Sequence, residues 1–168
     1  LSGSAAAQSF FDILPCSSFL SRVPSLSRSS LSKTLLAAAF ALAAYGLVFL
    51  LFSNYPMIFV ASILAVSWGD GAGEVVGRPL GKHKFHVWRG RNKSVEGSLA
   101  VVLMTFVAVI FAHFVFPLQV PSVYVLIIGT LVALVVAAIE VVSISWVDNV
   151  AIPIVSGLLL WYLVAPFL

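Results

Sequence analysis

The chain has 168 residues, of which 61% are hydrophobic and only 9% are charged, and its mean hydropathy is +1.13. A soluble domain carries about 25% charged residues, so this composition excludes an ordinary soluble domain and indicates an integral membrane protein. The single cysteine, Cys16, excludes an internal disulfide and any cysteine-based metal site. The formal net charge of +3 gives no indication of nucleic-acid binding.

Residues 1–33 are serine-rich and contain Arg22, Arg28 and Lys33, with Asp12 as their acidic residue. Such a composition does not build a core, so we expect an N-terminal tail over residues 1–33 and a single transmembrane helical domain over residues 34–168. A serine-rich, acid-poor leader with arginines is also typical of organelle transit peptides. Because the sequence does not start with methionine, we expect its N-terminus to be processed or cut.

Apolar segments follow the tail in regular succession, at residues 35–52, 55–68, 99–116, 123–142 and 150–168. Most are long enough to cross a bilayer, which takes about 20 residues. The second is shorter and could cross only a thin region of the bilayer, or cross with help from the residues that follow it. We therefore predict an all-α polytopic membrane protein: a bundle of about five transmembrane helices with a polar catalytic loop on the cytoplasmic-type face.

Charge placement predicts which loops share a membrane face. Six of the nine basic residues lie between residues 66 and 100: Arg78, Lys82, Lys84, Arg89, Arg91 and Lys93. Short loops rich in lysine and arginine stay on the cytoplasmic side, and counting spans places the tail and the loop between residues 140 and 148 on that side too. Most acidic residues then converge on the same face: Asp70, Glu74, Glu96, Glu140 and Asp148.

Acidic side chains near membrane depth are costly unless they are paired, hydrated or bound to a cation. Their convergence therefore predicts a functional site. The alternative is that they are ordinary loop charges that neutralise neighbouring lysines and arginines.

The run GDGAGEVVG, residues 69–77, carries two of these acids. If it is helical, Asp70 and Glu74 lie on one face and could share a divalent cation. Glycines 69, 71 and 73 would let the backbone approach a ligand closely, while glycines 73, 77 and 81, spaced by four, would equally suit close helix packing. The spacing matches neither the dinucleotide-binding nor the phosphate-loop pattern, so soluble nucleotide-binding folds are not supported.

Two interpretations also fit the basic residues that follow. They could hold a polyphosphate and its Mg²⁺ at the membrane surface, which is most of what phosphoryl transfer requires. They could instead set the topology and attract anionic lipid headgroups, worth about 1 kcal/mol each. His83 and His86 have no third ligand nearby in sequence, so we expect solvated histidines rather than a metal pair.

The combined motifs decide between these interpretations. The run GDGAGEVVGRPLGKHKF, followed by RNKSVEGSLA, resembles the family of CTP-dependent lipid kinases that includes phytol, farnesol, dolichol and yeast-type diacylglycerol kinases. That family is related to phosphatidate cytidylyltransferases. The matching features are a Gly-Asp-Gly that ends a span, a Gly-Arg-x-x-Gly segment with a lysine close behind, and a Lys-Ser-x-x-Gly-Ser before the next span. Glu140 and the run VDNVAIPI extend the resemblance to residues 67–153.

The resemblance implies CTP as phosphoryl donor, Mg²⁺ or another divalent cation, and an isoprenoid or glyceride alcohol in the membrane as acceptor. It implies Asp70 as metal ligand, with Glu74 as a second, and catalytic roles for Asp70, Lys93 and Asp148. The residues expected to bind the substrates are Gly69, Gly71, Arg78, Gly81, Lys82, Lys93, Ser94, Gly97, Ser98, Asp148 and Asn149.

Two other functions remain open at this point. A cytidylyltransferase-type enzyme would attack the α-phosphate of CTP, and a non-catalytic scaffold or transporter would use the same charges to bind lipid. An endoplasmic reticulum, plastid or bacterial inner membrane would satisfy the charge pattern equally.

Overall fold

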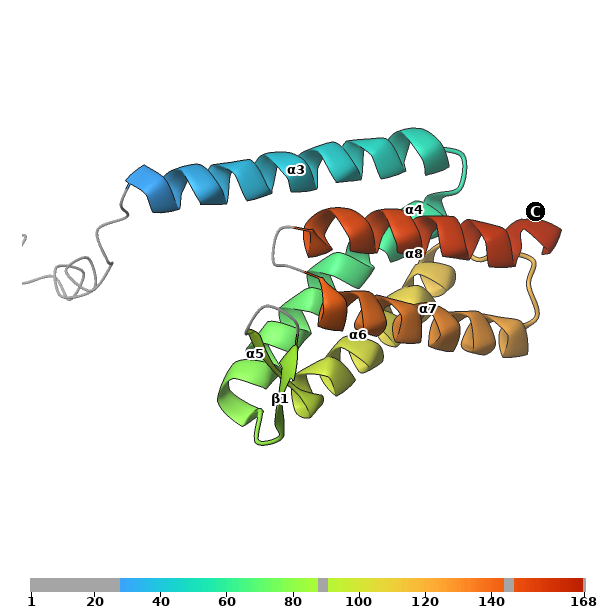
Figure 1. The fold of residues 1–168 in the computed structure, drawn as a ribbon. Helices are drawn as coiled ribbons and strands as arrows, with labels where there is room; N and C mark the ends of the chain where they lie inside the picture. The colour runs from blue at the N-terminus through green and yellow to red at the C-terminus, as the bar shows by residue number, and fades with distance from the viewer. Residues whose placement is uncertain (1–27, 88–90, 144–146, 168) are drawn as a thin grey trace, which may run out of the picture. The chain divides into compact units, whose positions relative to one another are not determined.

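The computed structural model describes residues 28–87, 91–143 and 147–167, without the side chains of residues 28–34 and Arg91 (Figure 1). The chain divides into two units, residues 1–36 and 37–168, and the second contains the core and the candidate site. Arg22, Arg89 and the side chains of Arg28 and Lys33, all named in the charge argument, lie outside what is described.

Helices dominate the described chain. In chain order the elements are α3 (Arg28–Phe52), α4 (Pro56–Leu64), the π-helical segment η1 (Ala65–Asp70), α5 (Gly71–Leu80), β1 (Lys84–Val87), β2 (Arg91–Ser94), α6 (Val95–Val115), α7 (Ser122–Val142), α8 (Asp148–Val164) and the 3₁₀ turn η2 (Ala165–Phe167). The described residues include five helices long and apolar enough to cross a membrane. The prediction of an all-α, multi-pass integral membrane protein is confirmed.

The second span extends much further than its apolar run. Helix α4, η1 and α5 follow one another without a break, so the candidate span covers Pro56–Leu80. Residues 70–80, the first part of the polar segment, are therefore helical. Helix α3 likewise begins at Arg28, inside the range expected to form the tail.

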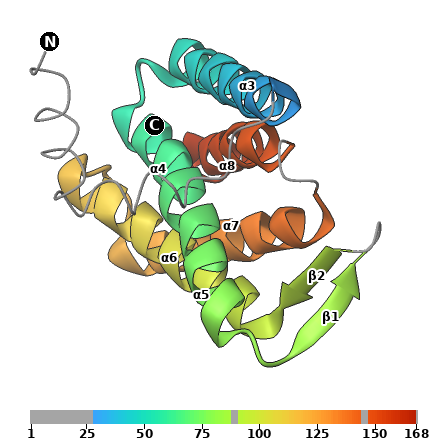
Figure 2. The same cartoon turned by 90° about the vertical axis from the view of Figure 1, so that its left-hand side faces the viewer.

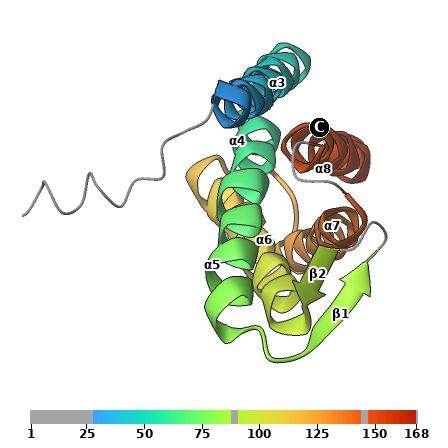
Figure 3. The same cartoon turned by 60° about the vertical axis from the view of Figure 1, so that its left-hand side comes forward.

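Close packing explains why the glycine-rich segment is helical. Helix α5 lies against the beginning of α6 (Figures 2 and 3). A Cβ atom added at Gly97 would lie 3.0 Å from the carbonyl oxygen of Gly73 and 3.1 Å from the Cα atom of Gly77. Glycine is a poor helix former, but here its missing side chain lets two backbones meet, as small residues do between membrane helices.

The core lies where α4, η1, α6, α7 and α8 meet. Segment η1 contacts α6, α7 and α8, and the most completely buried core side chains come from these elements: Ile58, Ala61, Ala65, Val101, Val109, Val132, Val136, Ile152 and Leu160. Helix α3 joins this core through Val48 and Phe52. Since η1 ends at Asp70, the packing of η1 against three helices places that carboxylate beside their ends.

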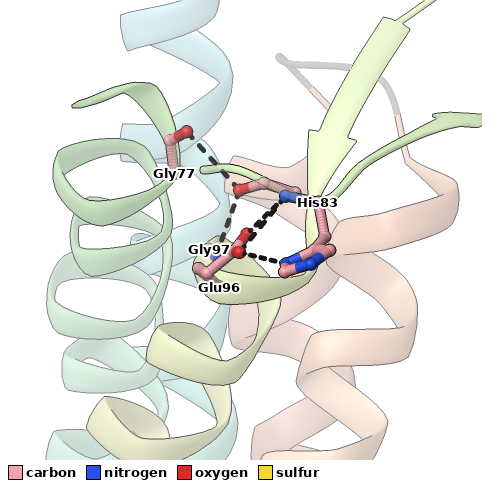
Figure 4. Close-up of polar contacts among 5 residues, drawn as sticks. Gly77, His83, Glu96 and Gly97 are labelled. Atoms are coloured by element: carbon pink, nitrogen blue, oxygen red, sulfur yellow. Dashed lines mark hydrogen bonds and ion pairs between the residues drawn. The ribbon is translucent and has the colours of Figure 1, made fainter. Parts of the chain in front are cut away.

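A short hairpin links α5 to α6. Strands β1 and β2 pair antiparallel, with Lys84 opposite Ser94 and Val87 opposite Arg91. Two contacts hold the hairpin at the start of α6 (Figure 4). The Ser94 hydroxyl accepts a hydrogen bond from the Gly97 N–H group at 3.1 Å and donates one to the Gly77 carbonyl at 3.4 Å, so it caps α6 and ties it to α5.

His83 makes the second contact. Its backbone N–H group donates to the Glu96 carboxylate, at 3.2 and 3.3 Å to the two oxygens, and its ring Nδ1 lies 2.7 Å from Glu96 Oε1. Both His83 and His86 are exposed to solvent. His83 thus connects the hairpin to the first turn of α6; we call this contact the His83–Glu96 latch.

Candidate functional site

A cavity of about 370 Å³ opens where the ends of four helical spans meet the hairpin. Its wall is formed by Asp70, Gly73, Glu74, Gly77, Arg78, Lys84, Asn92, Lys93, Ser94, Gly97, Ser98, Glu140 and Asp148. These residues come from η1, α5, both strands, the start of α6, the last turn of α7 and the first residue of α8. The cavity therefore brings together the segments around residues 70–98 and 140–148, which the span count placed on one membrane face.

Many of the residues expected to bind the metal ion or the substrates line this cavity: Asp70, Glu74, Arg78, Lys93, Ser94, Gly97, Ser98 and Asp148. The remaining ones do not: Gly69, Gly71, Gly81, Lys82 and Asn149. Gly69 packs on Thr105 of α6, and Gly81 on Ser94 and the Gly77 carbonyl, so both serve helix and hairpin packing. A Cβ atom at Gly71 would meet nothing within 4 Å.

The wall also contains residues that were not expected to bind substrates. These are Gly73, Gly77, Lys84, Asn92 and Glu140. Glu140 stood among the converging acids, without a role in the site. Lys84 and Asn92 reach the cavity because β1 and β2 pair. The KFHV run of β1 alternates polar and apolar residues, but it is only four residues long and the RNKS run of β2 has no apolar residue, so the sequence did not indicate this pairing.

Two ion pairs organise the charges of the wall. Lys93 Nζ pairs with Glu140 Oε1, which links β2 to α7, and these side chains are only 15% and 7% exposed. Arg78 pairs with Glu74 one helical turn earlier, but both side chains are mostly exposed. The first is a buried ion pair that joins segments far apart in the sequence. The second is a surface ion pair, and such pairs contribute at most about 1 kcal/mol to the free energy of unfolding.

Two polar atoms of the wall are buried without a hydrogen-bond partner in the described part of the chain, Ser98 Oγ and Glu140 Oε2. Buried polar atoms are almost always hydrogen-bonded in folded proteins, and leaving one unpaired costs about 1–3 kcal/mol. Both residues line the cavity, so a polar ligand there would satisfy these atoms.

The carboxylates suit a cation that is shared with a ligand. Asp148 is 3% exposed and lines the cavity with Asp70 and Glu140. Within residues 28–87, 91–143 and 147–167, no group of three or more His, Cys, Asp or Glu side chains is placed to hold a metal ion by itself. Mg²⁺ usually keeps several waters and binds through one or two carboxylates together with substrate phosphates, so this donor set fits a magnesium–polyphosphate complex.

Sequence comparison provides information that is independent of the structure. The chain is 33% identical over 107 residues to a phytol kinase from Synechocystis sp., and the alignment covers 63% of this chain and 44% of that protein. The chain is related to the lipid-kinase family that its motifs indicated. It spans less than half the length of this curated relative. No protein-family model matches the sequence, and no solved structure matches it significantly.

The groups that line the cavity are of the kinds that a relative of a lipid kinase needs to bind a phosphate chain and Mg²⁺. Lysine and arginine side chains bind phosphate oxygens, carboxylates bind Mg²⁺, and buried hydroxyls donate hydrogen bonds to anions. All three kinds of group converge where spans end, and a lipid headgroup occupies that depth of the bilayer.

Proposed function

We propose that this chain carries the phosphoryl-transfer site of a lipid kinase that uses CTP to phosphorylate a membrane lipid alcohol such as phytol, farnesol, dolichol or diacylglycerol. The observation that carries the proposal is the cavity itself, in which Arg78, Lys84 and Lys93 meet Asp70, Glu140 and Asp148 at the ends of spans. The related phytol kinase supports both the reaction and an isoprenoid alcohol as acceptor.

The side chains divide the work of phosphoryl transfer, which is mostly positioning and charge neutralisation. Lys93, held in the wall by Glu140, contacts the transferring phosphate, and Ser98 Oγ donates a hydrogen bond to a phosphate oxygen. Asp70 would hold Mg²⁺ together with the phosphates, and the bound ion would neutralise their negative charge. Ser94 acts indirectly, because its hydroxyl already bonds Gly97 and Gly77.

The acceptor enters from the membrane with its hydroxyl at the level of the helix ends. Its oxygen forms a bond to the γ-phosphorus while the bond between that phosphorus and the β,γ-bridging oxygen breaks, so CDP leaves. The hydroxyl proton passes to a carboxylate of the cavity, and Asp148 at the start of α8 is our choice for that base.

The choice of CTP as donor rests on the family resemblance, since nothing in the described wall is recognisably a reader of cytosine. The test is to incubate the purified protein in lipid with γ-labelled CTP or γ-labelled ATP and a panel of phytol, farnesol, dolichol and diacylglycerol. We expect labelled lipid monophosphate, with CTP the better donor at equal concentration. Equal or better use of ATP would remove CTP from the proposal, and no labelled lipid with either donor would refute it.

A further inference from the structure

The charges of the cavity wall are not equally available to a ligand. Four carboxylates and three cations line the cavity among the described residues. Glu140 engages Lys93, and Glu74 engages Arg78. The side chain of the third cation, Lys84, makes no ion pair or hydrogen bond with any described residue, and it is exposed.

The difference between the paired cations and Lys84 determines which of them a polyphosphate can bind most easily. An anion that binds Lys93 or Arg78 must compete with the carboxylate already bound there, whereas an anion that binds Lys84 displaces only water. Carboxylates outnumber cations in the wall by four to three, and without Lys84 they would do so by four to two, so its loss would make the wall more repulsive to an anionic ligand. A lysine ammonium group on a flexible side chain is well suited to such a first contact.

Position distinguishes Lys84 from Lys82, which lies two residues earlier in the sequence. Lys84 is the first residue of β1, where pairing with Ser94 holds its backbone beside the start of α6. Lys82 lies two residues earlier, is also exposed, and does not line the cavity. Both lysines contribute equally to the positive charge of this membrane face, so they form a matched pair for experiment.

We propose that Lys84, and not Lys82, is the residue that recruits the phosphate chain of the nucleotide to this cavity. The inference deepens the proposed function and rests on it for the identity of the nucleotide. It needs only that the cavity takes a polyphosphate, whatever reaction follows. Anionic lipid headgroups present the same phosphate chemistry, and the experiment separates that source from a soluble one.

The experiment measures equilibrium binding to the full chain in nanodiscs of neutral phosphatidylcholine, with Mg²⁺–CTP and Mg²⁺–triphosphate as probes. Lys84→Gln is compared with Lys82→Gln and with the unmodified protein, and thermal unfolding of each variant checks the fold. We expect Lys84→Gln to raise the Kd for both probes about tenfold, because one charge-assisted hydrogen bond is lost. Lys82→Gln should leave both Kd values unchanged.

If the two substitutions weakened probe binding equally, the probes would respond only to the overall positive charge of the loop, and the proposal would be overturned. So would an unmodified protein that binds neither probe, or a Lys84 effect that appears only when anionic lipid replaces phosphatidylcholine. Failure of the proposed function looks different. The Lys84 variant would then lose triphosphate binding as expected, while the unmodified protein would still produce no lipid phosphate.

Discussion

At the scale of single residues, Asp70 is the acidic residue of the site whose position most requires a compensating cation. It is the last residue of the π-helical segment η1, half-buried, on the cavity wall and between two glycines. π-Helical turns are rare and occur often at functional sites. A carboxylate there is costly unless a cation offsets it, which is why we assign Asp70 to the metal rather than to packing.

The substitution Asp70→Asn should therefore abolish activity while the protein still folds and inserts into the membrane. Asparagine keeps the size but not the charge, so Mg²⁺ binding weakens and turnover should fall by about two orders of magnitude or more. The measurement is specific activity per folded molecule across a Mg²⁺ titration. Near-normal turnover at unchanged expression would refute the metal role, and a loss of activity in proportion to lost protein would indicate a structural one.

The two ion pairs of the wall should differ in their contribution to stability. Glu140→Gln leaves Lys93 mostly buried without its partner, and breaking a buried pair costs about 3 kcal/mol. Glu74→Gln breaks an exposed pair and should cost less than about 1 kcal/mol. Unfolding of both variants in the same detergent compares them, and equal stability would contradict the assignment of the Lys93–Glu140 pair as a buried ion pair.

At the scale of elements, the contact between α5 and the start of α6 builds one side of the cavity. Both helices contribute wall residues, and glycines 73, 77 and 97 set how closely they approach. The Ser94 cap and the His83–Glu96 latch then attach the hairpin to the same place. The geometry of the cavity wall thus depends on backbone contact more than on any single long side chain.

Gly97→Ala tests that dependence. The added methyl group would lie 3.0 Å from both the Gly73 carbonyl oxygen and Ser94 Oγ, so the helices must separate, and overpacking of this kind costs about 1–3 kcal/mol. Gly46→Ala in α3 is the control, because a Cβ atom there meets nothing within 4 Å. We expect a lower thermal midpoint and weaker Mg²⁺–triphosphate binding in the first variant alone. Equal behaviour of the two would contradict the close contact.

The elements also show how far sequence reasoning reaches. Hydropathy located the spans well, because a continuous apolar run long enough to cross a bilayer is rare outside membrane-spanning helices. It left open whether α5 continues the second span, since glycine opposes helix formation locally and the packing against Gly97 that compensates is visible only in the structure. It also did not predict the hairpin, because its strands have only four residues each and only β1 alternates polar and apolar side chains.

The same limit applies to the site. Motif resemblance pointed to Asp70, Lys93, Ser98 and Asp148, and the structure brings them to one cavity. It named Lys82 and not Lys84, whereas Lys84 lines the cavity, because two lysines two residues apart differ only once the strand is formed. The sequence prediction assigned several glycines to ligand binding, whereas Gly69 and Gly81 serve packing. The sequence could not distinguish these two roles, because both require a residue without a side chain.

At the scale of the whole molecule, five candidate spans put the cavity at one membrane face and the loops around residues 54 and 119 at the other. This arrangement follows from the chain direction of successive spans. A site that binds both a water-soluble nucleotide and a lipid must lie at such a face.

Cysteine labelling in intact membranes checks this topology. In a background in which Cys16 is replaced by serine, Lys84→Cys and Ser143→Cys should react with an impermeant reagent from one side, and Gln119→Cys only from the other. Gln119 lies in an exposed stretch between α6 and α7, so access is not limited by packing. Labelling of Lys84→Cys and Ser143→Cys from opposite sides would contradict a shared site.

The central claim is that the terminal phosphate of a nucleotide moves to a lipid alcohol in this cavity. The most direct measurement supplies the protein in lipid with phytol and CTP labelled either at the γ- or at the α-phosphate, and follows the label into the lipid fraction. A kinase transfers the γ-label and releases CDP, so we predict labelled lipid from γ-labelled CTP alone, and none with Asp70→Asn. Transfer of the α-label with release of pyrophosphate, or no transfer of either label, would contradict the account.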